Sequence, residues 1–294
     1  MSERLFNEDF FKKIIKINMH INFKLSSGTQ GGRKSKAKGV SVEFSDYRDY
    51  APGDDFRRID WNAYGRFDKF FIKVFMEERE GVFNFFIDKS KSMDYGLINK
   101  KDTALKVVAA LSYIALNNLD RVNISTMESG NIENIKSAAG NKAFLRILRE
   151  LDNLEFKGST DLTKSIKKRP LSNRGASIIV SDFLNNYGLK DLEESLKYLA
   201  FKKQEIILVQ ILSEEEINPD FNNEITFIDS ETNEAVKMSL TPNVIKEYKR
   251  ALKLYKNSLE DLVKKYGGKF ISVSSSMEIE EIILGEFSKK RVLY

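Results

Sequence analysis

The chain has 294 residues, of which 41% are hydrophobic and 31% are charged. That length suffices for one large domain, or for a domain of about 200 residues with a smaller one attached. It contains no cysteine and one histidine, His20, which excludes disulfide frameworks, Cys/His zinc sites and thiol nucleophiles. We expect a cytoplasmic protein without a membrane span, because no apolar run approaches about 18 residues and the start does not resemble a signal peptide.

The first 80 residues have a mixed character. Residues 7–23 show the spacing of an amphipathic helix, and the segment SSGTQGGRKSKAKG at 26–39 has the composition of a mobile loop. Residues 40–80 combine short alternating runs such as FIKVF with turn signals such as APGDD, which indicates a small β-containing region. The excess positive charge lies at the beginning, since residues 1–40 carry nine Lys/Arg and three Asp/Glu.

From residue 82 onward, short apolar runs alternate with helical patterns. The runs predict strands at 82–88, 121–127, 176–182, 205–212 and 269–274. Strands that are apolar on both faces are typical of a parallel sheet covered by helices. Residues 103–119 have helical spacing with apolar residues on almost every face, so this helix should be buried. A second helix is predicted between Thr241–Pro242 and Gly267–Gly268.

Two hairpins interrupt this alternation. Residues 125–137 predict a hairpin that adds one antiparallel edge strand, and residues 224–240 predict a second hairpin before the long helix. We therefore expect an N-terminal α+β region at 1–80 and a doubly wound, mostly parallel α/β domain at 81–294 that carries the hairpin insertion near 224–240.

Oxygen-bearing side chains occur at three places that should meet at one edge of this sheet. In open parallel sheets, ligands bind outside the carboxyl ends of the strands. The residues in question are Asp88, Ser90 and Ser92 after the first strand, Thr160 in the loop KGSTDL, and Asp182 at the end of ASIIVSD. Hydroxyl and carboxylate oxygens without His or Cys suit Mg²⁺ or Mn²⁺. The alternative is ordinary capping, for which the same residue types are favoured.

The segments IDKSKSM, GSTDL and VSDF resemble, in this order, the metal-ion-dependent adhesion site of von Willebrand factor A domains. The resemblance implies that Ser90, Ser92 and Thr160 coordinate the ion through hydroxyls, that Asp88 and Asp182 act mainly through water, and that one position is left for a partner's carboxylate. Two lysines, Lys89 and Lys91, lie between the ligands. They would weaken ion binding if they pointed inward, but strand alternation directs them away.

The string GVSVEFSDYRDYAPGDDFRRIDWNAYGR at 39–66, followed by Glu77, Glu78, Arg79 and then IDKSKSM, resembles the family called domain of unknown function 58. Members are commonly encoded beside MoxR-type AAA+ ATPases and are thought to work with them as adaptors in protein assembly or maturation. The resemblance implies a non-catalytic protein-binding module. Its partner would be such an ATPase or a client protein that offers a carboxylate, and no small-molecule substrate is expected.

Charged and aromatic residues within that string have two possible roles, a docking surface for a partner or a structural charge network. These residues are Glu43, Arg48, Asp54, Arg57, Asp60 and Trp61. We favour the structural network, because Arg–carboxylate pairs are a common way to fix a small subdomain.

Two other functions stay open at this point. A Mg²⁺-dependent phosphoesterase would use the same ion as a Lewis acid, although the predicted ligands lack the acid-rich set that such chemistry usually needs. The basic arm at 24–38 could bind an anionic surface or nucleic acid. However, no aromatic residue is interleaved at 26–38 for base stacking, so we favour a solvated loop and do not expect nucleic acid as a partner.

Overall fold

The computed structural model describes residues 5–20, 43–76, 81–140, 143–172, 175–184, 188–219, 224–228, 235–239 and 241–293. The chain divides into two compact units. The α/β unit comprises Met1–Ser27 and Gly81–Tyr294, and the small unit comprises Gly28–Glu80. The basic arm at 24–38, the segment Glu77–Arg79 and the predicted turn near Thr232 lie outside the described residues.

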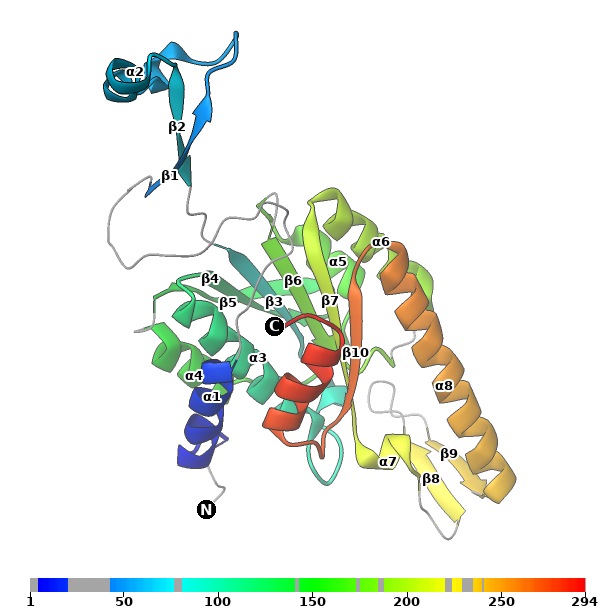
Figure 1. The fold of residues 1–294 in the computed structure, drawn as a ribbon. Coiled ribbons are helices and arrows are strands. Elements are labelled where there is room, and N and C mark those ends of the chain that lie inside the picture. The colour runs from blue at the N-terminus through cyan, green and yellow to red at the C-terminus, as the bar shows by residue number, and fades with distance from the viewer. Residues whose placement is uncertain are drawn as a thin grey trace. The chain divides into compact units, whose positions relative to one another are not determined.

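A six-stranded sheet runs through the α/β unit in the order β10-β7-β6-β3-β4-β5 (Figure 1). Its strands are β3 (Val82–Asp88), β4 (Arg121–Glu128), β5 (Asn131–Ala139), β6 (Gly175–Ser181), β7 (Gln204–Leu212) and β10 (Lys269–Ser274). Neighbouring strands pair in parallel, except that β5 runs antiparallel to β4 at the edge. The expected fold, a doubly wound and mostly parallel sheet of the von Willebrand factor A-like kind with one antiparallel edge strand, is confirmed.

Helices cover both faces of the sheet (Figure 1). One face packs on α1 (Glu8–His20), α3 (Lys100–Asn117), α4 (Phe144–Asp152) and the π-helix η4 (Glu281–Phe287). The other face packs on α5 (Leu162–Lys168), α6 (Gly188–Phe201) and α8 (Pro242–Lys265). Side chains of β3 alternate between the two cores, with Phe85 and Ile87 on the first face and Phe86 on the second. This alternation turns Asp88 toward the second face as the strand ends.

The predicted helix 103–119 corresponds to α3, and it is buried as expected. The predicted long helix corresponds to α8, which begins with Thr241 as its N-cap and Pro242 in its first turn. Its second half enters the core through Leu259 and Val263. No residue of the first half is fully buried, so this half lies at the surface of the unit.

Both predicted hairpins are present. The first is β4–β5, whose turn places Ser129 and Gly130 at φ values of 50° and 73°. Positive φ at both central turn residues is the conformation that suits the twist of a two-residue hairpin. The second hairpin pairs β8 (Glu224–Ile228) with β9 (Ala235–Ser239), and it follows the short helix α7 (Glu214–Ile217).

The N-terminal helix belongs to the α/β unit rather than to the region that follows it. On α1, Phe10, Ile14 and Ile17 are buried in the same core as α3. The observed units also divide between Glu80 and Gly81, but residues 1–27 belong with the α/β unit instead of with the region that follows them, because the apolar face of this helix packs on α3. Residues 21–23, which we expected in the same helix, lie outside the described part of the chain.

The small unit contains β1 (Glu43–Asp49), the 3₁₀ turn η1 (Phe56–Arg58), α2 (Trp61–Phe67) and β2 (Phe71–Met76). Strands β1 and β2 form an antiparallel pair. Over the described residues of the whole chain, no helix has both the length and the apolar composition required to cross a bilayer.

Candidate functional site

The three predicted oxygen-bearing segments meet at the carboxyl edge of the sheet. Strand β3 ends at Asp88, and the chain continues through Ser90 into the 3₁₀ turn η2 (Lys91–Met93). Two backbone hydrogen bonds join this stretch to the loop before α5, from Lys157 N to the carbonyl of Lys89 (2.9 Å) and from Lys91 N to the carbonyl of Gly158 (2.9 Å). These bonds fix the loop at the register that brings Thr160 to Asp88.

Asp88 is the centre of the cluster. Its Oδ1 accepts hydrogen bonds from the Thr160 hydroxyl (2.5 Å) and from the backbone N–H of Ser90 (2.9 Å), and its Oδ2 accepts one from the Ser181 hydroxyl (2.6 Å). The Thr160 hydroxyl also lies 3.1 Å from the carbonyl oxygen of Met127. Asp88 and Thr160 are buried, at 2% and 1% exposure. A buried carboxylate with this many donors is held in one orientation.

The two serines lie beside this centre. Ser90 is buried, Ser92 is half-buried, and their hydroxyl oxygens are 3.0 Å apart. Ser92 is thus the member of the set that connects the buried oxygens with solvent. The lysines between the ligands do not enter the cluster: Lys89 pairs with Glu128 at 2.8 Å, and Lys91 is exposed.

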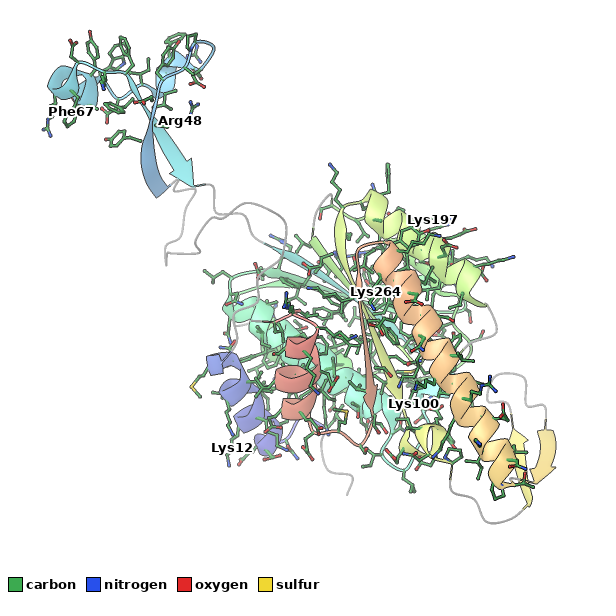
Figure 2. All side chains as sticks on the ribbon, turned by 45° about the vertical axis from the view of Figure 1, so that its right-hand side comes forward. Lys12, Arg48, Phe67, Lys100, Lys197 and Lys264 are labelled. Atoms are coloured by element: carbon green, nitrogen blue, oxygen red, sulfur yellow. The ribbon has the colours of Figure 1, made fainter. Side chains whose placement is uncertain are left out.

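Asp182 follows β6 directly and is also buried. Its Oδ2 accepts a hydrogen bond from the Lys100 ammonium at 2.8 Å, and its Oδ1 accepts one from the backbone N–H of Leu184 at 3.1 Å. Lys100, the first residue of α3, is itself fully buried and also donates to Glu216 of α7 at 2.6 Å. Figure 2 labels Lys100 in this part of the unit.

Electrostatics couple these groups. Burial raises the pKa of Asp88, and the negative charge of Asp182 raises it further, against the hydrogen bonds from Ser181 and Thr160. Burial by itself lowers the pKa of Lys100, but the charges of Asp182 and Glu216 outweigh that effect and leave the pKa above its ordinary value. Burial also raises the pKa of Glu216, although Lys100 opposes this.

The residues present fit a divalent cation. Asp88, Asp182 and Glu216 carry three negative charges when ionised, and Lys100 offsets one of them, so the cluster retains a charge of about −2. Burial first, and then the charge of Asp182, raise the pKa of Asp88, and a cation beside Asp88 would oppose both effects. Among the described residues, no three His, Cys, Asp or Glu side chains cluster as metal ligands. An ion here would therefore depend on the hydroxyls of Ser90, Ser92 and Thr160.

The residues singled out in the small unit have mainly local contacts. Arg48 forms two hydrogen bonds with Asp54, at 2.8 and 2.6 Å, and Asp60 caps α2 through the N–H groups of Asn62 and Ala63. Trp61 is 61% exposed and makes edge contacts with the rings of Tyr64 and Phe70. Arg57 is exposed, and the side chain of Glu43 lies outside the described residues. Among the described residues, the side chains of the set do not converge on one point: Arg48 pairs with Asp54, whereas Asp60 caps α2.

Sequence reasoning missed three members of the cluster, Ser181, Lys100 and Glu216. Ser181 could have been predicted, because it directly precedes Asp182 at the end of the same strand and lies on the same face of the sheet as Asp88. Lys100 and Glu216 could not, because each lies in the first turn of a helix whose sequence is ordinary and polar. Only the packing of α3 and α7 on the same edge brings them to Asp182.

Comparisons with known proteins found similar sequences and similar structures. Uncharacterized proteins from Mycobacterium bovis and Mycobacterium tuberculosis are 20% identical to this chain over 283 residues, which cover 94% of this chain and 88% of each relative. Among solved structures, the conserved hypothetical protein BatB from Bacteroides thetaiotaomicron is similar with a TM-score of 0.45 and 16% identity, over 71% of this chain and 98% of BatB.

The VWA domain of SpRpn10 is similar with a TM-score of 0.43 and 10% identity, over 73% of this chain and 97% of that domain. The family model described as "Protein of unknown function DUF58" matches residues 46–257, which include β3, the candidate site and most of α8. The chain belongs to this family.

Proposed function

We propose that this chain is a non-catalytic protein-interaction module that holds a partner's carboxylate through a divalent cation, Mg²⁺ or Mn²⁺, at the cluster around Asp88. The convergence of Asp88, Ser90, Thr160 and Asp182 on one buried, negatively charged edge carries the proposal. When bound, the cation supplies a positive charge with an open coordination position that a carboxylate can occupy.

Each side chain has a separate task in this proposal. Ser90, Ser92 and Thr160 offer neutral oxygens, so they leave the cation with charge for an incoming carboxylate. Asp88 orients Thr160 and Ser90 through its Oδ1, and Ser181 holds the same carboxylate from the other side. Lys100 fixes Asp182 and neutralises part of the local charge.

The finer part of the proposal is the partner, a MoxR-type AAA+ ATPase or its client protein, and the process, protein assembly or maturation. It rests on the family resemblance of the segment 39–66 and the motif IDKSKSM, and on the same family's match to residues 46–257.

The test compares two neutralising variants that keep side-chain shape. Asp88→Asn removes a charge from the cluster, and Asp161→Asn removes one from the adjoining cap of α5, which asparagine can still make. We expect Mg²⁺ to raise the melting temperature of the wild type and of Asp161→Asn but not that of Asp88→Asn. Capture of the ATPase or client should follow the same order and stop in excess chelator. Equal capture with and without chelator, in all three proteins, contradicts the proposal.

A further inference from the structure

A stripe of cations lies along the first and middle turns of α8, beside the candidate site. At about 100° per residue, five basic side chains fall within an arc of about 120° on this helix. They are Lys246, Lys249, Arg250, Lys253 and Lys256, named here the α8 stripe. The stripe is about 15 Å long at the helical rise of about 1.5 Å per residue. In Figure 1 the start of α8 lies beside β9, at the same end of the unit as α7.

The cations of the stripe differ from those at the end of the same helix. In the last turns, Lys264 pairs with Glu260 at 2.9 Å and Lys265 pairs with Glu193 at 2.8 Å. Within the stripe, the structure shows one weak ion pair among the described residues, between Arg250 and Glu247 at 3.7 Å. Lys256 is half-buried with no ion pair to a described carboxylate, and burial lowers its pKa. Positive charge therefore accumulates where the helix leaves the core.

Contacts from α8 connect the stripe with the candidate site. The Tyr248 hydroxyl donates to the carbonyl of Glu216 at 2.8 Å, and the Tyr255 hydroxyl donates to the carbonyl of Phe183, the residue after Asp182. At the near edge of the stripe, Lys249 donates to Asn218 at 2.9 Å, just after α7. The stretch from 248 to 255 thus flanks the loops that carry Asp182 and Glu216.

The acidic residues of α7 do not neutralise the stripe. Glu216 accepts from Lys100, Glu215 accepts from the backbone N–H of Leu97, and Glu214 accepts from Asn218 and the Ser274 hydroxyl. Each carboxylate therefore has its own partner within the α/β unit. Among the described residues, no carboxylate of α7 is paired with the stripe, so its cations are available to an external anion.

From this arrangement we infer that the partner segment is acidic and extended, with one carboxylate at the Asp88 site and further Asp or Glu side chains along the α8 stripe. The inference rests on the proposed function for its first contact. An extended chain advances about 3.3 Å per residue, so about five residues cover the stripe. A protein segment fits better than nucleic acid, because at about 100° per residue Tyr248 and Tyr255 fall outside the arc of the stripe, and their hydroxyls bond to the carbonyls of Glu216 and Phe183. No aromatic ring therefore lies among the five cations for bases to stack on.

The experiment measures binding of a fluorescein-labelled oligoglutamate peptide to the full chain by anisotropy, with Mg²⁺ or with excess chelator. The double variant Lys246→Gln/Lys253→Gln removes two stripe cations that have no ion pair among the described residues. The matched control, Lys190→Gln/Lys197→Gln on α6, removes the same charge from another exposed helix. We expect the stripe variant to bind roughly fivefold more weakly, with a flatter salt dependence, and the control to bind as the wild type.

The outcomes separate this inference from the proposed function. If the stripe variant binds the peptide as tightly as the wild type and chelator still releases the peptide, the role of the α8 stripe in binding is contradicted and the proposed function stands. Chelator-insensitive binding that still weakens in the stripe variant supports the stripe and overturns the proposed function. A single-stranded DNA oligomer that binds more tightly than the peptide, with the same dependence on Lys246 and Lys253, overturns the assignment to a protein segment. Equal urea midpoints for the variants establish that each is folded.

Discussion

The two units use the same residue types at very different ranges along the chain. In the small unit, Asp60 caps the helix two and three residues ahead of it, and Arg48 pairs with Asp54 six residues away. In the α/β unit, Asp88 bonds to Thr160 and Ser181 at separations of 72 and 93 residues. Lys100 reaches Asp182 and Glu216 over 82 and 116 residues.

Burial follows the same division. Asp88, Lys100, Thr160 and Asp182 are each at most 2% exposed, whereas Trp61 and Phe67 of the small unit are 61% and 65% exposed. A hydrogen bond or ion pair near the surface contributes little to the free energy of unfolding, because water can bind the same polar groups when the contact is lost. A buried contact between residues far apart in the chain contributes more, because it fixes whole helices and strands relative to one another. The comparison therefore predicts a large difference in how the two units respond to substitution.

The largest effect is expected from Lys100→Met. This change leaves Asp182 and Glu216 buried without their cation, which should lower the free energy of unfolding by about 3–5 kcal/mol. Urea denaturation measures it, and Mg²⁺ should restore part of the loss. The control is Lys101→Met, whose ion pair with Asp94 is partly exposed and should cost about 0–1 kcal/mol. Similar losses in both variants would remove the contrast between buried and exposed pairs.

A smaller effect is expected from Thr160→Val. The isosteric change removes the hydroxyl between Asp88 and the carbonyl of Met127 and should cost about 1–3 kcal/mol in urea denaturation. Ser92→Ala provides the comparison, because Ser92 is half-buried and its loss should affect stability little. Both variants should bind Mg²⁺ more weakly in calorimetric titration. Unchanged Mg²⁺ binding in both would argue against hydroxyl ligands.

In the small unit, Asp60→Ala should act locally. It removes the cap of α2 and the acceptor of the Tyr47 hydroxyl (2.7 Å), so the local opening free energy should fall by about 0.5–2 kcal/mol. Hydrogen exchange should accelerate at residues 61–67 and stay unchanged in α3. Asp60→Asn keeps a capping oxygen and should behave close to the wild type. Exchange that accelerates equally in α3 would show that the two units unfold together.

The smallest effect is expected from Arg48→Gln. Hydrogen bonds from Arg48, and then from the backbone of Ala51, hold the pKa of Asp54 below its ordinary value. A carboxyl whose pKa is lowered on folding stabilises the folded unit above the unfolded pKa, and this contribution is lost as the pH falls through the folded pKa. An NMR titration of the Asp54 carboxyl should show a higher pKa in Arg48→Gln, with a smaller difference at high salt. An unchanged pKa would exclude the pair in solution.

The amino-acid sequence by itself determined the strands of the large sheet, the two hairpins, and helices α1, α3 and α8. Apolar runs located β3 and β10 residue for residue, and capping signals located the start of α8, because strand and helix periodicity and helix caps depend on near neighbours. The strand ends then indicated that Asp88, Thr160 and Asp182 would share one edge, since carboxyl ends of parallel strands lie together. The family motifs added which oxygens to expect as ligands.

Only the tertiary structure decided what surrounds those oxygens. Nothing near Lys100 in the sequence marks it as the counter-ion of Asp182. Likewise, nothing near Phe10 shows that α1 packs with α3, because the residues of the small unit separate these helices in the sequence. The direction of the α8 stripe likewise depends on two tyrosine hydroxyls that bond to distant carbonyls. Local patterns set propensities over a few residues, whereas these contacts are fixed by the packing of elements far apart in the chain.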